Sequence, residues 1–312
     1  MEMILLALNV VFPLFFIMAV GYLTRRTGIV DNQGVGVVNR LLYWVFLPVL
    51  LFMSVYTTDL GEVFNVPVIV YSVVGTFVIF VISFFLLPKI GTKRDQCGVI
   101  VQALVRGNEV YYGFPVVIAL IGADYLGVMS VVVAFAAIEY NILSIIALEY
   151  FKGEKVNVGA LVRNVVTNPM ILATLLGVFM VTISLPLPAV VLKGMDSLSQ
   201  VATPFALFLL GASFTFASSK GYMKQVIWVT LFRLIFIPAV VVATTLWMGF
   251  DSYEIVILFV TFGVPTAVAS YSMARELKAD YELASQIVFY TSIVSILTMF
   301  IWTIVLQILG IV

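Results

Sequence analysis

The chain contains no histidine, one cysteine and few charged residues. Without histidine, the zinc-binding pattern HExxH of metallohydrolases is impossible, and the paired aspartates of prenyl-transferring enzymes are absent too. A single cysteine, Cys97, excludes an internal disulfide. The formal net charge is zero, which leaves no basic surface for nucleic acid. We therefore expect no enzyme, no metal or other cofactor, and no nucleic-acid partner.

Charge is scarce because most of the chain is apolar. Of its 312 residues, 63% are hydrophobic and 10% charged, and the mean hydropathy is +1.18. A water-soluble domain of this length does not have such a composition. Apolar runs of about 20 residues, bounded by charged or turn-forming clusters, indicate helices that cross a lipid bilayer. Ten runs fit this description: 4–24, 37–57, 64–88, 97–121, 126–150, 160–182, 190–215, 224–248, 253–276 and 281–309. We predict an all-α integral membrane protein with ten transmembrane helices.

The chain also contains two copies of one unit. Four features of the first half recur 156 positions later: Pro13 as Pro169, Gly21 as Gly177, Pro48 as Pro204, and Ala123-Asp124-Tyr125 as Ala279-Asp280-Tyr281. We place repeat one at 1–155 (helices 1–5) and repeat two at 156–312 (helices 6–10). Because each copy has an odd number of spans, the second must insert upside down. Inverted repeats are typical of secondary transporters.

The basic residues fall in alternate loops. They are Arg25, Arg26, Lys89, Lys93, Arg94, Lys152, Lys155, Arg163, Lys220, Lys224, Arg275 and Lys278, and Lys193 is the one basic residue of the opposite loops. Lys and Arg near span ends are retained on the cytoplasmic side. We therefore expect a multi-pass protein of the cell membrane with both termini extracytoplasmic.

The fourth span of each repeat contains helix-breaking residues. Span 97–121 holds Gly107, Asn108, Gly113 and Pro115, and span 253–276 holds Gly263, Pro265, Thr266 and Ser270. In hydrocarbon, an interrupted helix is tolerated only where it lines a protein cavity or binding site. The offset of 156 aligns Asn108 with Val264. A competing offset of 150 aligns the two Gly-x-Pro sequences and needs compensating gaps.

Two broken helices at one depth would each expose a half-helix N-terminus, which favours an anion between them. We predict that the substrate, a small organic anion such as a carboxylate, binds here. The candidate binding residues are Gly107, Asn108, Glu109, Gly113, Pro115, Gly263, Pro265, Thr266 and Ser270. The alternative is that Pro115 and Pro265 only kink continuous helices.

Four charged residues, Arg106, Glu109, Glu139 and Arg233, lie inside predicted spans. Such groups are costly in a membrane and indicate a functional site with a charged partner. Since an apolar environment favours the neutral form of a carboxyl group, Glu139 and then Glu109 are candidates to carry a coupling proton. Arg106, Arg233 and Asn141 complete the candidates for H⁺ or Na⁺ coupling. The structural alternative is an ion pair of Arg106 with Glu109, or of Glu139 with Arg233.

Several short motifs occur in an order that resembles one transporter family. They are Asn39-Arg40-Leu41 with Phe46-Leu47-Pro48, Asn108 with Gly113-Phe114-Pro115, Arg163-Asn164 through Asn168-Pro169, Leu210-Gly211-Ala212-Ser213, and Pro265 with Ala274-Arg275-Glu276. Over nearly its whole length the chain resembles the auxin efflux carrier family, in its compact prokaryotic form, within the bile acid/auxin carrier-like superfamily. That family includes plant auxin exporters and bacterial carriers proposed for malate and malonate.

The resemblance implies how the protein works. Helices 1, 2, 6 and 7 would form a scaffold that dimerises, and helices 3–5 and 8–10 a mobile transport domain that moves as an elevator. Asn108 and the Pro265 segment would line the substrate site. Gly107 stands where plant members have proline, and 151–159 replaces their long hydrophilic loop. We expect a secondary active transporter of small organic anions, with a sodium-coupled bile-acid-like carrier or a passive anion channel as alternatives.

Overall fold

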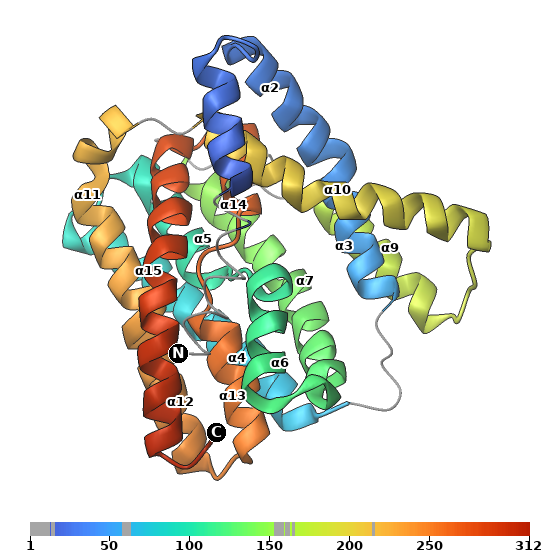
Figure 1. The fold of residues 1–312 in the computed structure, drawn as a ribbon, viewed down its shortest axis with the longest axis vertical. Helices are drawn as coiled ribbons and strands as arrows, with labels where there is room; N and C mark the ends of the chain where they lie inside the picture. Colours follow the sequence, from blue (N-terminus) through green and yellow to red (C-terminus); the bar gives the residue numbers. More distant parts are fainter. Residues whose placement is uncertain are drawn as a thin grey trace.

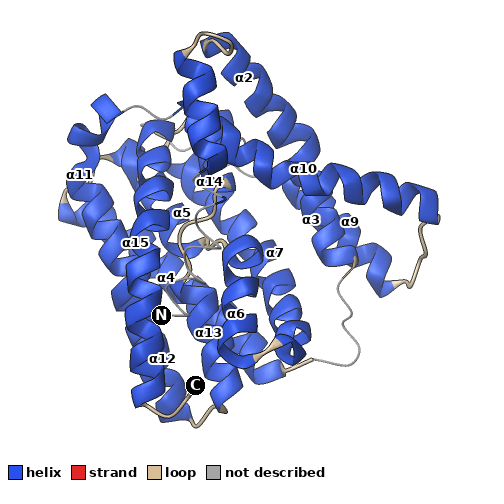
Figure 2. Cartoon of the chain, viewed as in Figure 1, coloured by secondary structure: helices blue, strands red, loops and turns tan. Residues whose placement is uncertain are grey.

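The computed structural model describes residues 16–57, 64–152, 166–213 and 216–312, together with the isolated positions 13, 159 and 163. These residues are overwhelmingly helical (Figures 1 and 2). The predicted boundary between the two repeats, at 155, and the Arg163-Asn164 part of the sixth-helix motif reach outside the described residues.

Short turns and irregular segments join the helices. In the first half, residues 16–26 are helical, followed by α2 (Asn32–Leu41), η1 (Leu42–Phe46), α3 (Leu47–Tyr56), α4 (Val66–Leu86), η2 (Leu87–Ile90), α5 (Arg94–Val105), η3 (Glu109–Gly113), α6 (Phe114–Ile121), η4 (Ala123–Tyr125) and α7 (Leu126–Phe151). In the second half come α9 (Pro169–Thr182), α10 (Ala189–Ser213), α11 (Phe216–Leu231), η5 (Phe232–Phe236), α12 (Ile237–Met248), α13 (Ser252–Gly263), α14 (Ala269–Glu276) and α15 (Tyr281–Ile308).

Three segments, η1, η3 and η5, are π-helical, and each directly precedes an α-helix with proline in its first turn. These prolines are Pro48, Pro115 and Pro238. A proline has no N–H to donate, and its ring collides with the carbonyl four residues earlier. The wider π turn accommodates that carbonyl, so the helical path continues. Pro48 and Pro115 therefore shape their helices and do not end them.

Five helices in the described part of the chain are long and apolar enough to cross a membrane. They span Asn32–Met53, Val66–Ile90, Gly127–Phe151, Gly221–Met248 and Tyr281–Ile308, and Pro169–Thr182 and Ser252–Gly263 are shorter apolar helices. The predicted spans 97–121 and 253–276 do not appear as long helices because each is interrupted. The predicted spans 4–24, 160–182 and 190–215 extend outside the described residues.

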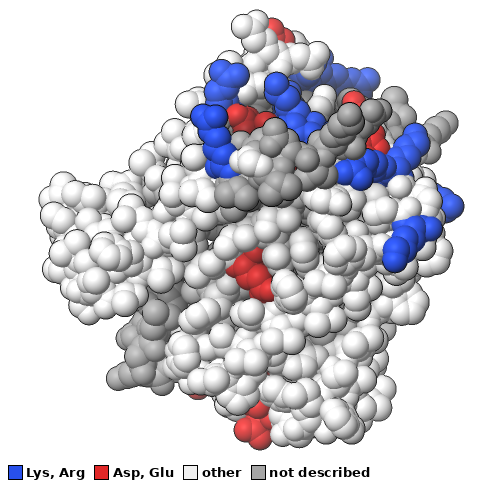
Figure 3. Space-filling model, turned by 180° about the vertical axis from the view of Figure 1, so that it is seen from behind, with Lys and Arg blue, Asp and Glu red and all other residues white. Residues whose placement is uncertain are grey.

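The outer surface is apolar and the polar side chains of several helices face inward. On α4, Ser72 and Thr76 are buried, whereas Val74 and Phe77 are more than half exposed. This inverted pattern is expected of a helix that contacts lipid. Lys and Arg gather at one end of the molecule, above a broad band that is white except for one acidic patch near its centre (Figure 3). The described residues therefore have the surface of a multi-pass membrane protein.

Helices α2, α3, α9 and α10 pack together along one side of the molecule, next to a larger body that contains α4–α7 and α11–α15 (Figure 1). Helix 16–26 crosses α10 closely, since Gly21 faces the backbone of Phe208 and Gly211 faces the backbone of Met18. A β-carbon at either glycine would overlap the backbone of the other helix. Small residues at such crossings let membrane helices pack tightly.

Candidate functional site

The predicted interruptions are present in both halves of the chain. Helix α5 ends at Val105, the backbone is extended at Arg106, and helical structure resumes at Glu109. Helix α13 ends at Gly263, the backbone is extended at Val264, and α14 begins at Ala269. These are gaps between helices, so the reading of two merely kinked helices is wrong. Pro265 lies inside its gap, whereas Pro115 lies beyond the first gap, in α6.

The two gaps contact each other. Gly107 and Thr266 form an antiparallel β-bridge, in which the backbone N–H of Asn108 donates to Pro265 O at 2.9 Å and that of Ala267 donates to Arg106 O at 3.2 Å. Unwinding thus frees backbone groups that the opposite gap satisfies, as a membrane interior requires. The offset of 150 would set Gly107 opposite Ile257, which lies within α13. The bridge joins residues 159 positions apart, which is neither offset, so the alignment of the two repeats stays a prediction.

Arg233, on η5, holds the crossing together. Its side chain is fully buried and donates from Nη1 to Leu104 O at 2.7 Å, from Nε to Val264 O at 2.9 Å and from Nη2 to Thr261 O at 3.4 Å. These carbonyls lie at the C-terminal ends of α5 and α13, where partial negative charge favours a cation. One guanidinium therefore caps both half-helices.

Thr266 adds a second connection at the crossing. It is fully buried, and its hydroxyl donates to Ala103 O on α5 at 3.1 Å. Its backbone N–H donates to Oγ1 of Thr291 on α15 at 3.3 Å. Thr266 thus ties the second gap to both α5 and α15.

Neither ion pair considered from the sequence is present. In the described part of the chain, Arg106 and Glu109 do not pair within 4.0 Å, and nor do Glu139 and Arg233. Arg233 instead contacts backbone carbonyls. Spacing along one helix predicted the first pair, but the chain unwinds between Arg106 and Glu109, so the two side chains leave from an extended segment and a π turn.

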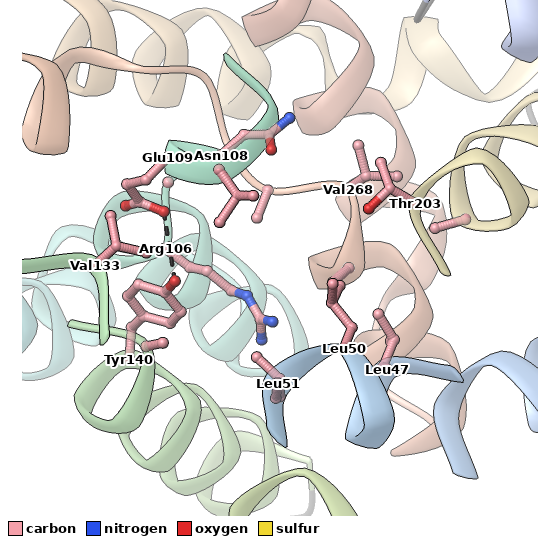
Figure 4. Close-up of a pocket in the computed structure, with 16 residues that line it drawn as sticks. Leu47, Leu50, Leu51, Arg106, Asn108, Glu109, Val133, Tyr140, Thr203 and Val268 are labelled. Carbon is pink, nitrogen blue, oxygen red and sulfur yellow. Dashed lines mark hydrogen bonds between the residues drawn. The ribbon is translucent and has the colours of Figure 1, made fainter. Parts of the chain in front are cut away.

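A cavity of about 70 Å³ opens beside the crossing (Figure 4). Both gaps line it, from Arg106 to Val110 and from Ala267 to Ala269. Helix α7 contributes Tyr140 to the lining. The opposite wall comes from α3 and α10 and includes Leu50 and Thr203. The cavity therefore lies between the larger body and the side helices.

The polar side chains at this cavity are mostly donors. Arg106 is 4% exposed and stacks over the Tyr140 ring, with 5.4 Å from its guanidinium carbon to the ring centroid. Its Nη1 approaches Met273 Sδ at 3.7 Å, and its Nε has no hydrogen-bond partner among the described residues. The buried Nδ2 of Asn108 also has no partner there. Glu109 accepts a hydrogen bond from Tyr140 Oη at 3.4 Å.

Two helix starts also meet the cavity. Helical structure begins at Glu109 in the first half and at Ala269 in the second, and both residues line the cavity. The first N–H groups of a helix have no partner within it and carry partial positive charge. With Arg106 and Asn108, these ends make the cavity a site for an acceptor with negative charge.

The structure separates the candidate residues into two groups. Gly107, Asn108, Glu109 and Arg106 line the cavity, whereas Gly113, Pro115, Gly263, Pro265, Thr266 and Ser270 lie in the gaps or in the adjoining helices without lining it. Sequence reasoning missed the wall formed by Leu47, Leu50, Leu51 and Thr203. Leu47 belongs to the Phe46-Leu47-Pro48 motif, but no local pattern marks these four residues as the wall of a site.

The remaining candidates for coupling lie on α7, outside this cavity. Glu139 is half-buried next to Tyr140, and its Oε2 has no partner in the described part of the protein. Asn141 is buried and donates from Nδ2 to Ala137 O at 2.6 Å. Its Oδ1 has no partner among the described residues.

Comparison with known proteins agrees with this geometry. The chain matches the family described as "Membrane transport protein" over residues 6–303. It is 24% identical over 301 residues to a Rhizobium meliloti protein named "Putative malonate transporter", which covers 93% of this chain and 92% of the relative. It is 20% identical over 311 residues to a Methanocaldococcus jannaschii transporter whose name gives no substrate, over 96% of this chain and 98% of that one.

A third relative, from Methanothermobacter thermautotrophicus, is 21% identical over 298 residues and is also named as a transporter without a substrate. The family and all three relatives are membrane transporters and not enzymes. Because the match extends over nearly the whole length, the chain belongs to the membrane transport protein family, the auxin efflux carrier family that its motifs resemble.

Proposed function

We propose that this protein is a secondary transporter of small organic anions, which bind where the two interrupted helices meet. The observation that carries the proposal is the paired gap, bridged at Gly107 and Thr266, beside a cavity lined by both helix starts. Secondary transporters place substrates at such interruptions, with half-helix N-termini directed at anionic groups. The name of the Rhizobium meliloti relative, which refers to malonate, is consistent with a carboxylate.

Movement follows from the two groups of helices. In the proposal, helix 16–26, α2, α3, α9 and α10 form a scaffold, and the larger body carries the bound anion past it as an elevator. The cavity lies at the boundary, with Leu50 and Thr203 on the scaffold side and Asn108 on the body. Sliding at this boundary would expose the site to each side of the membrane in turn. If two copies of the chain formed a homodimer through their scaffolds, the scaffolds would stay fixed while the larger bodies move.

Coupling to an ion is part of the same proposal. Glu139, whose Oε2 finds no partner in the described residues, is the candidate to carry a proton. Asn141 and Ser144 place on α7 two further buried oxygens that lack a partner in the described part of the chain, which suits Na⁺ as the alternative. We expect Glu139→Gln to flatten the pH dependence of uptake without abolishing it. If replacing Na⁺ by K⁺ at fixed pH stops uptake instead, the coupling ion is Na⁺.

The test of the function is transport by the purified protein in liposomes. We expect uptake of a radiolabelled small carboxylate, either malonate or its monoamide malonamate, to saturate with concentration and to be accelerated by the same unlabelled compound inside, because a carrier exchanges its substrate. Flux that rises linearly and shows no exchange would identify a channel. Asn108→Ala should abolish uptake while the protein stays monodisperse in detergent. Arg40→Gln, at an exposed position away from the cavity, is the matched control.

A further inference from the structure

Two arginines lie at the crossing, and they differ in what their side chains bind. Arg233 directs all three of its nitrogens at backbone carbonyls of the half-helices. Arg106 is buried as deeply, yet among the described residues its side chain meets one sulfur, at 3.7 Å, and the face of one aromatic ring. An arginine has five N–H groups to donate. Arg233 is thus occupied, and Arg106 is open to a ligand.

The open guanidinium lies in the cavity. Arg106 lines it, and the side chain extends from the first gap toward Leu51 on the opposite wall (Figure 4). Leaving a buried cation without an acceptor is costly, and a planar guanidinium matches a carboxylate through two parallel hydrogen bonds. The amide Nδ2 of Asn108, on the same cavity wall, is a second donor without a partner among the described residues.

The fixed charges around the cavity set the charge that a ligand can carry. The charge of Arg233 faces the negative C-terminal ends of α5 and α13, so those opposing charges balance. Glu109 lines the cavity with Arg106, its Oε1 also lies beside Arg233 Nη2 next to Gly107, and its negative charge offsets one of these two cations. What remains is the partial positive charge of two helix starts, about half a charge each. One negative charge on the ligand balances it, whereas a second would be buried without a partner.

Resting on the function proposed above, we propose that Arg106 is the side chain that binds the substrate carboxylate, and that Glu109 restricts the site to anions with a single charge. Arg106 thus determines specificity, a role distinct from ion coupling. The other lining residues near Arg106, such as Leu50, Leu51 and Val133, are apolar. In the proposal they contact the part of the substrate that is not the carboxylate. The substrate class is therefore a small monocarboxylate with an uncharged body.

Four compounds with a three-carbon chain test this at pH 7.5, because they differ mainly in charge. They are malonamate (one negative charge), malonate (two), malonamide (none) and β-alanine (zwitterionic). Their affinities for the purified full-length protein in detergent are measured by isothermal titration calorimetry. We expect malonamate to bind at least about tenfold more tightly than the other three. Malonamide loses the charge-assisted hydrogen bond to Arg106, malonate adds a negative charge near Glu109, and β-alanine adds a positive charge near Arg106.

Variants of the two charged residues complete the test. Arg106→Gln should weaken malonamate binding at least about tenfold, the loss of one charged hydrogen bond. Arg106→Lys should bind more weakly but keep the preference for malonamate over malonamide, because the charge remains. Glu109→Gln should shift the preference from malonamate toward malonate. Arg40→Gln removes a positive charge at an exposed position and should leave all four affinities unchanged.

The possible outcomes separate this inference from the proposed function. If the wild-type protein binds neither carboxylate nor the zwitterion, the proposed function fails. If Arg106→Gln binds malonamate as well as wild type while Asn108→Ala does not, Arg106 has no part in binding and the function stands. A wild-type preference for malonate or β-alanine overturns the charge limit. If Arg106→Gln does not fold, equal binding of malonamate and malonamide by Arg106→Lys overturns the assignment.

Discussion

At the scale of single residues, the crossing depends on a position without a side chain. A β-carbon on Gly107 would overlap Nη2 of Arg233 and approach Oε1 of Glu109 within 2.5 Å and a methyl group of Val264 within 2.7 Å. Gly107 therefore lets the guanidinium of Arg233 reach both half-helices. The contacts of Arg233 with both half-helices therefore require glycine at position 107.

Gly107→Ala should lower the melting temperature of the solubilised protein, because buried overpacking of this kind costs about 1–3 kcal/mol. Gly36→Ala is the matched control, since no atom lies within 4 Å of the β-carbon added there, in α2. Alanine should be neutral or slightly stabilising at that position, because it favours helix more than glycine does. Thermal melts of both variants decide this. Equal melting temperatures would show that the crossing has room for a methyl group.

Replacing Arg233 and replacing Arg106 should have opposite effects on the stability of the protein. Arg233→Met leaves the buried carbonyls of Leu104 and Val264 without a donor, and each such group costs about 1–3 kcal/mol. Arg106→Met removes a buried cation that lacks an acceptor in the described residues, which is neutral or stabilising. Denaturation of both variants should place Arg233→Met well below wild type and Arg106→Met at or above it. The reverse order would contradict the structural assignment.

At the scale of elements, the two gaps differ in how proline acts. Pro115 follows a π turn and lies in α6, whereas Pro265 lies within the second gap and accepts the Asn108 N–H through its carbonyl. A proline cannot donate in a helix and disfavours helical backbone in the residue before it. Pro265 thus keeps α13 from continuing through the crossing.

Pro265→Ala should slow transport more than it destabilises the fold, because the gap loses its barrier to helix formation but keeps the contacts of Arg233. Initial uptake rates in liposomes and thermal melts of the same preparation provide the comparison. Pro67→Ala, at the exposed start of α4, is the control and should change neither. Wild-type uptake by Pro265→Ala would show that the gap persists without proline.

At the scale of the whole molecule, contacts between the proposed scaffold and the body are polar at one point and apolar at another. Glu276, at the end of α14, accepts hydrogen bonds from Asn39 at 3.2 Å and from the indole of Trp44 at 3.0 Å. Leu50 and Val268 line the cavity from the two sides (Figure 4). Movement of the body past the scaffold has to separate these contacts.

A reversible cross-link across the cavity tests that movement. The native Cys97 is the only cysteine, so Cys97→Ser provides a background for the pair Leu50→Cys and Val268→Cys. We expect a short bifunctional methanethiosulfonate to stop uptake and a reducing agent to restore it. Each single cysteine variant, treated in the same way, should keep its uptake. Full uptake by the cross-linked pair would exclude sliding at this boundary.

Much of the fold could be predicted from local patterns in the sequence. Long apolar runs predicted helices close to those observed, for example 126–150 against Leu126–Phe151. Gly107 and Pro265 predicted interruptions because glycine and proline act on their own backbone. The partners of the buried charged residues could not be predicted from such patterns. Spacing suggested Glu109 for Arg106 and helix bracing suggested Glu139 for Arg233, and the described residues contain neither pair.

Hydrophobicity and backbone restriction belong to each residue, so local sequence established that the chain is apolar and helical and indicated where two helices stop. Contacts between distant segments required the folded chain: the bridge between the two gaps, the capping of both half-helices by Arg233, and the cavity wall formed by Leu50 and Thr203. Those outcomes depend on which segments distant in sequence become neighbours, because a buried donor binds whichever acceptor packing brings within reach.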